Sequence, residues 1–200
     1  MSSEVEIRAL VPNATAAEDA LRDAGFACTA AFEQLDMMYD RPDGALFRSG
    51  QKIRIRVEGN HAELTYKGAF QGDASASRRT EVNVLIQPKD TGSLSELLEA
   101  LGYPLLFQVR KARNVFRAGA VTATLDDWPI IGPMLELEGD EADIKEVAEA
   151  TFPGIEFANY RLKTLFEKVC AERGLSLAEL QKEYEGRSGF KLGNLGFLLQ

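Results

Sequence analysis

Hydrophobic and charged residues alternate along several short segments of this chain. Residues 4–8 read Glu-Val-Glu-Ile-Arg, residues 53–56 read Ile-Arg-Ile-Arg, and residues 135–138 read Leu-Glu-Leu-Glu. Residues i and i+2 of a strand point to the same side. Each segment, read as a strand, therefore has one apolar face and one row of charges. This pattern is typical of an antiparallel sheet with one face on the core and one face in a polar environment.

The same reading, extended along the chain, predicts eight strands that mostly follow one another through hairpins. They are expected at 4–11, 27–39, 52–58, 62–67, 78–86, 105–117, 120–127 and 134–138. Consecutive hairpin-linked strands form an antiparallel sheet, so the predicted fold class is α+β. Eight antiparallel strands can close into a β-barrel, a tunnel wide enough for one small ligand. The charged rows would then line the tunnel, and the helices would pack outside.

Five helices are predicted from apolar spacing and from their start signals. They are expected at 15–23, 93–101, 141–151, 159–173 and 176–185. Three of them begin with the sequence of a capping box, in which a Ser or Thr precedes a Glu by three positions. These boxes are Thr15–Glu18, Ser93–Glu96 and Ser176–Glu179. In the second helix, the predicted buried stripe consists of Leu94, Leu97, Leu98 and Leu101.

Length and composition fit one domain with a small extension. The chain has 200 residues, of which 45% are hydrophobic, enough for a sizeable core. We predict a tunnel domain at 1–173 and a helical extension with a Gly-containing tail at 174–200. With no apolar run long enough to cross a membrane, no signal-peptide pattern and two widely spaced cysteines, the expected location is the cytoplasm.

The charge distribution favours a small anionic ligand over a polymer. The net charge of −8 repels nucleic acid and anionic lipid, so neither a nucleic acid nor a membrane is expected as a partner. Basic residues nevertheless cluster between Arg48 and Arg117, while acidic residues dominate both ends. The oligomeric state is left open, with a homodimer among the arrangements considered.

Rows of acidic and of basic side chains suit the binding of a triphosphate together with its metal ion. Arg and Lys neutralise and position phosphate groups, and the planar fork of Arg fits phosphate well. Mg²⁺ or Mn²⁺ prefers oxygen ligands and often joins phosphates to one or two carboxylates. Charges that face inward are costly unless they are paired or bind ions. Charged rows inside a tunnel therefore call for an ionic ligand.

The order of these motifs resembles the CYTH superfamily, the triphosphate tunnel metalloenzymes. This group includes class IV adenylate cyclases, thiamine triphosphatases and inorganic triphosphatases. The resemblance covers residues 4 to about 167. It rests on Glu4-x-Glu6-x-Arg8, Tyr39-Asp40, Ile53-Arg54-Ile55-Arg56, Leu64-Thr-Tyr-Lys67-Gly68, Arg79-Thr-Glu81, Leu101-Gly-Tyr103, Lys111-x-Arg113, Asp126, and Gly132 followed by Glu136-x-Glu138. Each motif alone is common, and their shared order is what is specific.

The resemblance implies a role for each matched residue. It implies metal binding by Glu4, Glu6, Glu136 and Glu138, with Mg²⁺ or Mn²⁺ as the cofactor. It implies triphosphate binding by Arg54, Arg56, Lys67, Arg79, Lys111 and Arg113. Arg8, Glu81 and Asp126 fall at positions that act in the chemistry, assist the metal or orient the basic residues. The implied substrate is tripolyphosphate, ATP or thiamine triphosphate.

Two positions depart from the family pattern. The opening motif of the family ends in Lys, and here the residue is Arg8. Arginine keeps the charge, but its pKa, above about 12, prevents it from accepting a proton at neutral pH. A glutamate that often follows the position of Glu81 by two residues is Asn83 in this chain.

Three functions remain open at this point, and one carrier function is disfavoured. Hydrolysis of inorganic triphosphate is the first choice, because it needs no base pocket and the sequence identifies none. Conversion of ATP to cyclic AMP and pyrophosphate by a class IV adenylate cyclase is the second, favoured by the spacing from Leu101 to Glu136. A non-catalytic triphosphate-binding or polyphosphate-binding protein is the third. A lipocalin-like carrier would require apolar residues where the charged rows lie.

Overall fold

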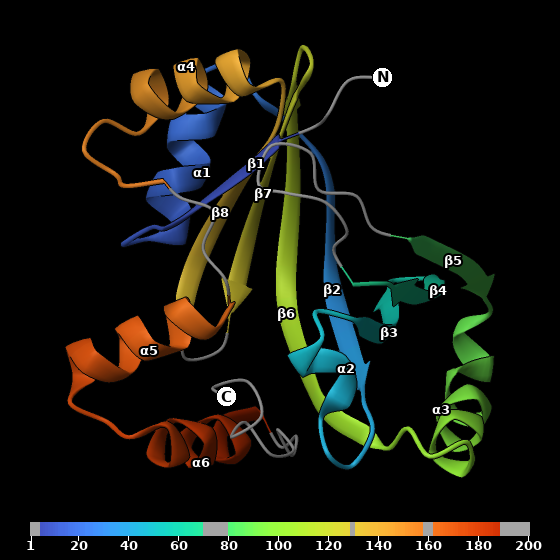
Figure 1. Cartoon of the computed structure of the whole chain (residues 1–200). Helices are drawn as coiled ribbons and strands as arrows, with labels where there is room; N and C mark the ends of the chain where they lie inside the picture. Colours follow the sequence, from blue (N-terminus) through green and yellow to red (C-terminus); the bar gives the residue numbers. More distant parts are fainter. Residues whose placement is uncertain (1–4, 70–79, 129–130, 158–161, 189–200) are drawn as a thin grey trace. The chain divides into compact units, whose positions relative to one another are not determined.

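The structure is a computed structural model, and it describes all residues except 1–4, 70–79, 129–130, 158–161 and 189–200 (Figure 1). The chain divides into two compact units. The first unit comprises residues 1–33 and 111–175, and the second comprises residues 34–110 and 176–200. The predicted boundary between a domain at 1–173 and an extension at 174–200 stays a prediction.

The described part of the chain contains the eight predicted strands in one antiparallel sheet, which confirms the α+β class. In order along the sheet, the strands are β1 (Val5–Leu10), β8 (Gly132–Gly139), β7 (Val121–Trp128), β6 (Leu105–Ala118), β2 (Ala27–Tyr39), β3 (Lys52–Glu58), β4 (His61–Lys67) and β5 (Glu81–Ile86). Strands β2 and β6 run through both units. Closure of this sheet into a tunnel by a further strand pairing stays a prediction.

The core of the first unit lies on the apolar face of β1, β7 and β8. Helices α1 (Ala14–Asp23) and α4 (Glu141–Thr151) pack on these strands (Figure 1). Leu21 of α1, Ile144 of α4 and Leu137 of β8 are fully buried in this core. Val5 and Ile7 of β1 pack against it. The alternation in the sequence thus correctly predicted which face of β1 and β8 is apolar.

The second unit has its own smaller core, next to helix α3 (Thr91–Ala100). Ile55 of β3, Tyr39 of β2 and Leu98 of α3 are buried together, and Ile53 and Leu64 pack against them. Two short helical segments, α2 (Ala45–Arg48) and a 3₁₀ turn at Pro88–Asp90, complete the described connections of this unit. Ile53 and Ile55 confirm the predicted apolar face of β3.

Two predicted helix starts are wrong, although both helices exist. Helix α1 is capped by Asn13, whose Oδ1 accepts a hydrogen bond from the Ala16 amide at 3.0 Å. Thr15 therefore lies inside the helix, because the extended backbone of Asn13 already presents a capping oxygen. Helix α3 begins at Thr91, since the 3₁₀ turn before it leads directly into helical backbone, and Ser93 also lies inside it.

The predicted buried stripe of α3 is also only partly correct. Leu98 is buried, whereas Leu97 and Leu101 are 53% and 63% exposed. Leu94 and Leu98, four residues apart, lie one above the other on the helix and both contact the core. Leu97 and Leu101 form the neighbouring row, which the small core of this unit does not cover.

The third capping box is confirmed at the start of α6 (Leu177–Ser188). The Ser176 amide donates to Glu179 Oε2 at 2.7 Å, and the Glu179 amide donates to Ser176 Oγ at 3.3 Å. The predicted helix at 159–173 corresponds to α5 (Leu162–Arg173), and its predicted start falls outside the described residues. Most of the predicted Gly-containing tail, from residue 189 onward, also lies outside them. The described residues include no helix with the length and apolar character needed to span a membrane.

The packing of α4 on the sheet gives a first testable prediction. Replacing Ile144 by Ala removes a fully buried side chain and should lower the free energy of unfolding by about 2–5 kcal/mol. Glu149→Ala, an exposed change on the same helix, should alter it by less than about 0.5 kcal/mol. Urea titration followed by circular dichroism measures both. Equal stability of the two variants would contradict the placement of α4 on this core.

Candidate functional site

The charged rows lie on the face of each strand opposite the cores, and strand register brings opposite signs together. In the β1–β8 pair, Arg8 is directly across from Glu136, and Glu6 is directly across from Glu138. In the β6–β7 pair, Arg113 is directly across from Asp126. These residues all belong to the first unit. Directly opposed residues in a sheet have side chains close enough to interact.

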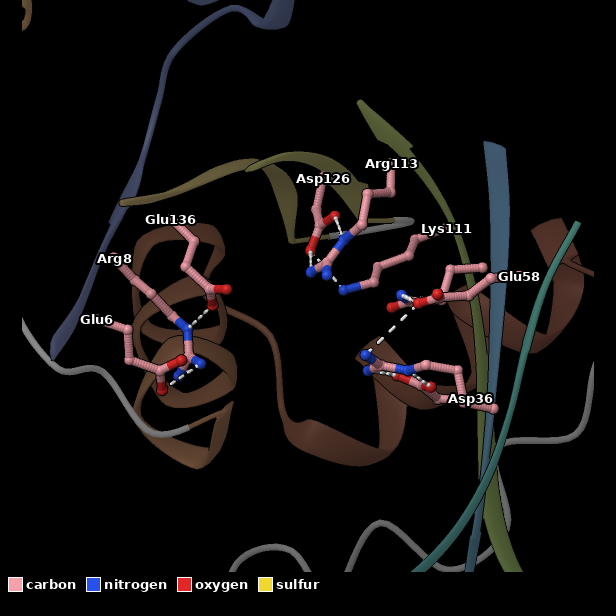
Figure 2. Close-up of polar contacts among 10 residues, drawn as sticks. Glu6, Arg8, Asp36, Glu58, Lys111, Arg113, Asp126 and Glu136 are labelled. Atoms are coloured by element: carbon pink, nitrogen blue, oxygen red, sulfur yellow. Dashed lines mark hydrogen bonds and ion pairs between the residues drawn. The ribbon is translucent and has the colours of Figure 1, made fainter. Parts of the chain in front are cut away.

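Arg8 lies between two carboxylates that the sequence assigned to metal binding. Its Nε donates to Glu136 Oε2 at 2.5 Å, and its Nη2 donates to Glu6 Oε1 at 2.7 Å (Figure 2). Burial lowers the pKa of Arg8, but the nearby Glu136 and Glu6 outweigh this effect and raise the pKa above its ordinary value. Arg8 is therefore a permanent cation held by two strands at once.

Of the other two predicted metal ligands, the structure describes only one. Glu138 lies on the same face of β8 as Glu136, and Glu4 falls outside the described residues. The described residues contain no ready-made cluster of three or more His, Cys, Asp or Glu side chains that could hold a metal ion. The predicted four-carboxylate metal site is therefore untested.

The donor chemistry around Glu136 nevertheless fits a hard cation such as Mg²⁺ or Mn²⁺. Glu6, Glu136 and Glu138 offer only carboxylate oxygens, the ligand type that these ions prefer. Thr124 lies across from Glu136 in the β7–β8 pair. Its hydroxyl is buried and has no hydrogen-bond partner among the described residues. An unsatisfied buried oxygen across from the Glu136 carboxylate is what a bound ion or its water would satisfy.

Among the described residues of the first unit, Asp126 has the most buried charged side chain, at 1% exposure. Both cations that the sequence assigned to phosphate binding on β6 contact it. Arg113 donates from Nε and Nη2 to the two carboxylate oxygens at 2.6 and 2.7 Å, and Lys111 donates its ammonium to Oδ2 (Figure 2). Burial raises the pKa of Asp126, but Arg113 and Lys111 outweigh this and hold the pKa below its ordinary value.

Lys111 also contacts an aromatic ring. Its ammonium lies 4.5 Å from the centroid of the Trp128 ring, a cation–π arrangement. Lys111 is itself buried, so its position is fixed by a carboxylate and a ring together. Asp126 and Trp128 thus orient the two cations of β6 without a ligand. The like charge of Arg113 also acts on Arg8, so the two groups of charges interact.

In the second unit, Arg56 of β3 is held by a carboxylate that the sequence reasoning missed. Its Nε and Nη2 donate to the two oxygens of Asp36 on β2 at 2.6 and 2.8 Å, a bidentate pair. Glu58 lies 3.6 Å from Arg56 Nη1 (Figure 2). Gln34 is fully buried and donates its amide to Glu58.

Arg54, the neighbour of Arg56 in the charged row of β3, is only weakly compensated. Its Nη2 lies 3.4 Å from Thr65 Oγ1 and 3.9 Å from Glu63 Oε1, and its Nε is buried with no hydrogen-bond partner in the described part of the chain. Burial and the like charge of Arg56 lower the pKa of Arg54. A buried guanidinium in this condition would be stabilised by an anion.

The remaining predicted residues of the second unit lie on β4, β5 and the segment between them. Lys67 pairs with Glu81 directly across the β4–β5 ladder, with Nζ and Oε2 at 3.1 Å. Arg79 falls outside the described residues. Asn83 donates to Glu81 at 3.3 Å, so the residue that departs from the family pattern contacts the predicted acidic residue.

Gln34 and Asp36, which the sequence reasoning missed, show the same two-residue spacing as the charged residues that it identified. Gln34 and Asp36 are two apart on β2, and Asp36 pairs with Arg56 across the β2–β3 ladder. The spacing of polar residues in the segment 27–39 was therefore sufficient to place them on the charged face. Only the register between β2 and β3, which the sequence does not show, identifies Arg56 as the partner of Asp36.

Known proteins resemble this chain in sequence and in fold. Residues 2–159 match the family model of the CYTH domain. A protein of Methanocaldococcus jannaschii, provisionally named an adenylate cyclase, is 28% identical over 143 residues, which make up 72% of this chain and 80% of that protein.

Solved structures show the same fold. A Pyrococcus horikoshii protein is 28% identical, with a TM-score of 0.60 over 83% of this chain and 99% of that one. A Hippeastrum protein provisionally named an adenylyl cyclase, for which a dominant triphosphatase activity is described, has a TM-score of 0.62. It is 18% identical and covers 82% of this chain and 94% of its own, a likeness that shows the fold alone.

The buried position of Asp126 gives a second prediction. Asp126→Asn leaves Lys111 and Arg113 without their counter-charge and should lower the free energy of unfolding by about 3–5 kcal/mol at pH 7. The pKa of Asp126 is lower in the folded chain than the unfolded value of about 3.9. Its stabilisation is therefore fully present above that pH and is lost as the pH falls through the folded pKa.

The stability difference between wild type and Asp126→Asn should accordingly narrow in acid. Urea titrations at neutral pH and at a series of acidic pH values measure it. The neighbouring exposed change Asp127→Asn is the control and should shift stability by less than about 0.5 kcal/mol. A difference that stays constant with pH would show that the ionised Asp126 is not what stabilises the cluster.

Proposed function

The chain belongs to the CYTH domain family, and on that premise we propose that it is a divalent-metal-dependent enzyme that hydrolyses inorganic triphosphate. The observation that carries this proposal lies in the first unit. Two carboxylates on neighbouring strands, Glu6 and Glu136, share one cation, and next to them two more cations converge on the buried Asp126. A metal-bound polyanion requires both kinds of group on one polar face.

The proposed roles follow from these contacts. Lys111 and Arg113 bind phosphate oxygens, and Asp126 orients them, because its two oxygens fix the directions of both side chains. Glu6, Glu136 and Glu138, with Glu4, would hold Mg²⁺ or Mn²⁺. The ion supplies charge neutralisation and Lewis acidity to the phosphoryl group. Phosphate-binding roles are proposed in the second unit for Arg54, Arg56, Lys67 and Arg79, with Glu81 orienting Lys67.

In the proposed reaction, a water oxygen attacks a terminal phosphorus of tripolyphosphate. The bridging P–O bond breaks, and orthophosphate and pyrophosphate leave, with one water proton released to solvent. Catalysis of such a step depends mainly on positioning and on stabilisation of charge. Arg8 fits the second task, because its raised pKa keeps it protonated throughout. It does not fit the task of proton acceptor.

A class IV adenylate cyclase is the second candidate, and the name of the Methanocaldococcus jannaschii relative favours it. In that reaction the ribose 3′-oxygen of ATP attacks the α-phosphorus, and pyrophosphate leaves. Both reactions bind the same triphosphate group, so the charged residues suit either one. We choose hydrolysis of inorganic triphosphate because this reaction needs no pocket for a nucleobase, whereas the cyclase reaction does.

The third prediction is the outcome of a product assay on the purified protein. It is incubated with tripolyphosphate, ATP and thiamine triphosphate, each with Mg²⁺ and with Mn²⁺. Orthophosphate and pyrophosphate should form from tripolyphosphate, and no cyclic AMP should form from ATP. Glu136→Gln should lower turnover by about 10- to 100-fold, because it weakens the proposed metal site. Lys145→Gln, which removes an exposed cation from a surface ion pair, should leave turnover unchanged.

Cyclic AMP with pyrophosphate from ATP would establish the cyclase instead. Tight binding of tripolyphosphate with no product from any substrate would establish a binding protein.

Arg8 supplies the fourth prediction, which separates an enzyme from a sensor. At saturating metal, Arg8→Lys should change turnover by less than about tenfold, because the proposed role of this residue is that of a fixed charge. A gain of about 10²-fold or more, the usual contribution of a positioned proton-transfer group, would mean that the natural chain binds triphosphate without efficient turnover. Binding of tripolyphosphate, measured by calorimetry without metal, should be similar in both proteins.

A further inference from the structure

Arg8 lies where the proposed metal ligands meet. Its guanidinium contacts Glu136 through Nε and Glu6 through Nη2, so one rigid, planar cation bridges carboxylates on two strands (Figure 2). A divalent cation that used these two carboxylates would lie against the same groups as the guanidinium, and the two cations would repel each other. The ion pair and the metal site are therefore alternatives for at least part of their ligand set.

The chemistry of arginine makes this competition stronger than a lysine would. The guanidinium has five donors in a fixed fork and stays charged at any pH the protein would meet. An ammonium group is a compact point charge with flexible reach and is more strongly hydrated. The half-buried position of Arg8 reduces screening by solvent, which strengthens its interaction with the carboxylates.

Binding of an anion nearby would favour release of Arg8 from these carboxylates. Arg113 carries a like charge that acts on Arg8, so the two guanidinium groups repel one another. A triphosphate bound by Lys111 and Arg113 would replace this repulsion with attraction. Its oxygens can accept the charge-assisted hydrogen bonds that the two carboxylates accept now.

We propose that Arg8 is an internal competitor of the metal ion, which holds Glu6 and Glu136 in the metal-free protein and transfers to the triphosphate when substrate binds. The inference rests on the proposed function for its metal and its anion, and it adds an order of events. The metal site has low affinity until the polyanion draws the guanidinium away. Metal loading is thereby tied to the presence of substrate.

The test measures two binding constants that should move in opposite directions. In Arg8→Gln, Mn²⁺ without any phosphate compound should bind more tightly than in wild type, by about 10- to 100-fold, the range that neighbouring groups contribute to metal affinity. Tripolyphosphate in the presence of EDTA should bind more weakly, because one cation has been lost. Free Mn²⁺ is followed by its electron paramagnetic resonance signal, and tripolyphosphate binding by calorimetry.

Matched variants locate the effect. Lys145→Gln, which frees an exposed glutamate from a surface ion pair, should change neither constant. Adding Glu136→Gln to Arg8→Gln should remove the gain in Mn²⁺ affinity. Arg8→Lys keeps the charge but not the fork, so it should give a smaller gain in Mn²⁺ affinity and should retain tripolyphosphate binding. It also serves as the test if Arg8→Gln does not fold.

Either of two results overturns the inference. Mn²⁺ affinity that is unchanged or lower in both Arg8 variants would show that the guanidinium does not compete. Tripolyphosphate affinity that is unchanged in Arg8→Gln would show that Arg8 does not transfer to the anion. Failure of the proposed function is a separate result, since it means that no orthophosphate forms from tripolyphosphate, whereas both binding constants are measured without turnover.

Discussion

The polar face of the first unit depends on one buried carboxylate. Asp126 binds Arg113 through both oxygens and Lys111 through one. A buried charge is tolerated only when it is paired and fully hydrogen-bonded, and here two cations from β6 supply that compensation. Asp126 also pairs with Arg113, whose like charge acts on Arg8. Three basic residues can therefore lie near one another on this face.

Much of the fold was predictable because period-two alternation is a local property of the sequence. Glu6 and Arg8 share the charged face of β1, as their spacing indicated. Leu135 and Leu137 share the apolar face of β8, which packs on the core, as their spacing also indicated. Helix ends were less predictable. Asn13 and Thr15 are both competent caps, and the choice between them depends on backbone conformation that neither residue type fixes. The exposure of Leu97 and Leu101 likewise depends on how large the neighbouring core is.

The candidate site was predicted as a set of residues but not as a set of pairs. The sequence placed Arg56 and Lys111 on charged faces, yet their partners depend on strand register, which is a tertiary property. Asp36 and Gln34 were missed for this reason. Arg8 shows the same limit. Its departure from the family lysine was visible in the sequence, but only the register of β1 and β8 places it between Glu6 and Glu136.

One contact places a fluorescent side chain next to the ionic cluster around Asp126. Trp128 is the single tryptophan of the chain, and the Lys111 ammonium lies over its ring. The emission of an indole depends on the charges close to it, so the intrinsic fluorescence of this protein comes from the edge of the cluster around Asp126. The protein thus carries its own spectroscopic probe at the position where phosphate is proposed to bind, and no dye or label needs to be introduced.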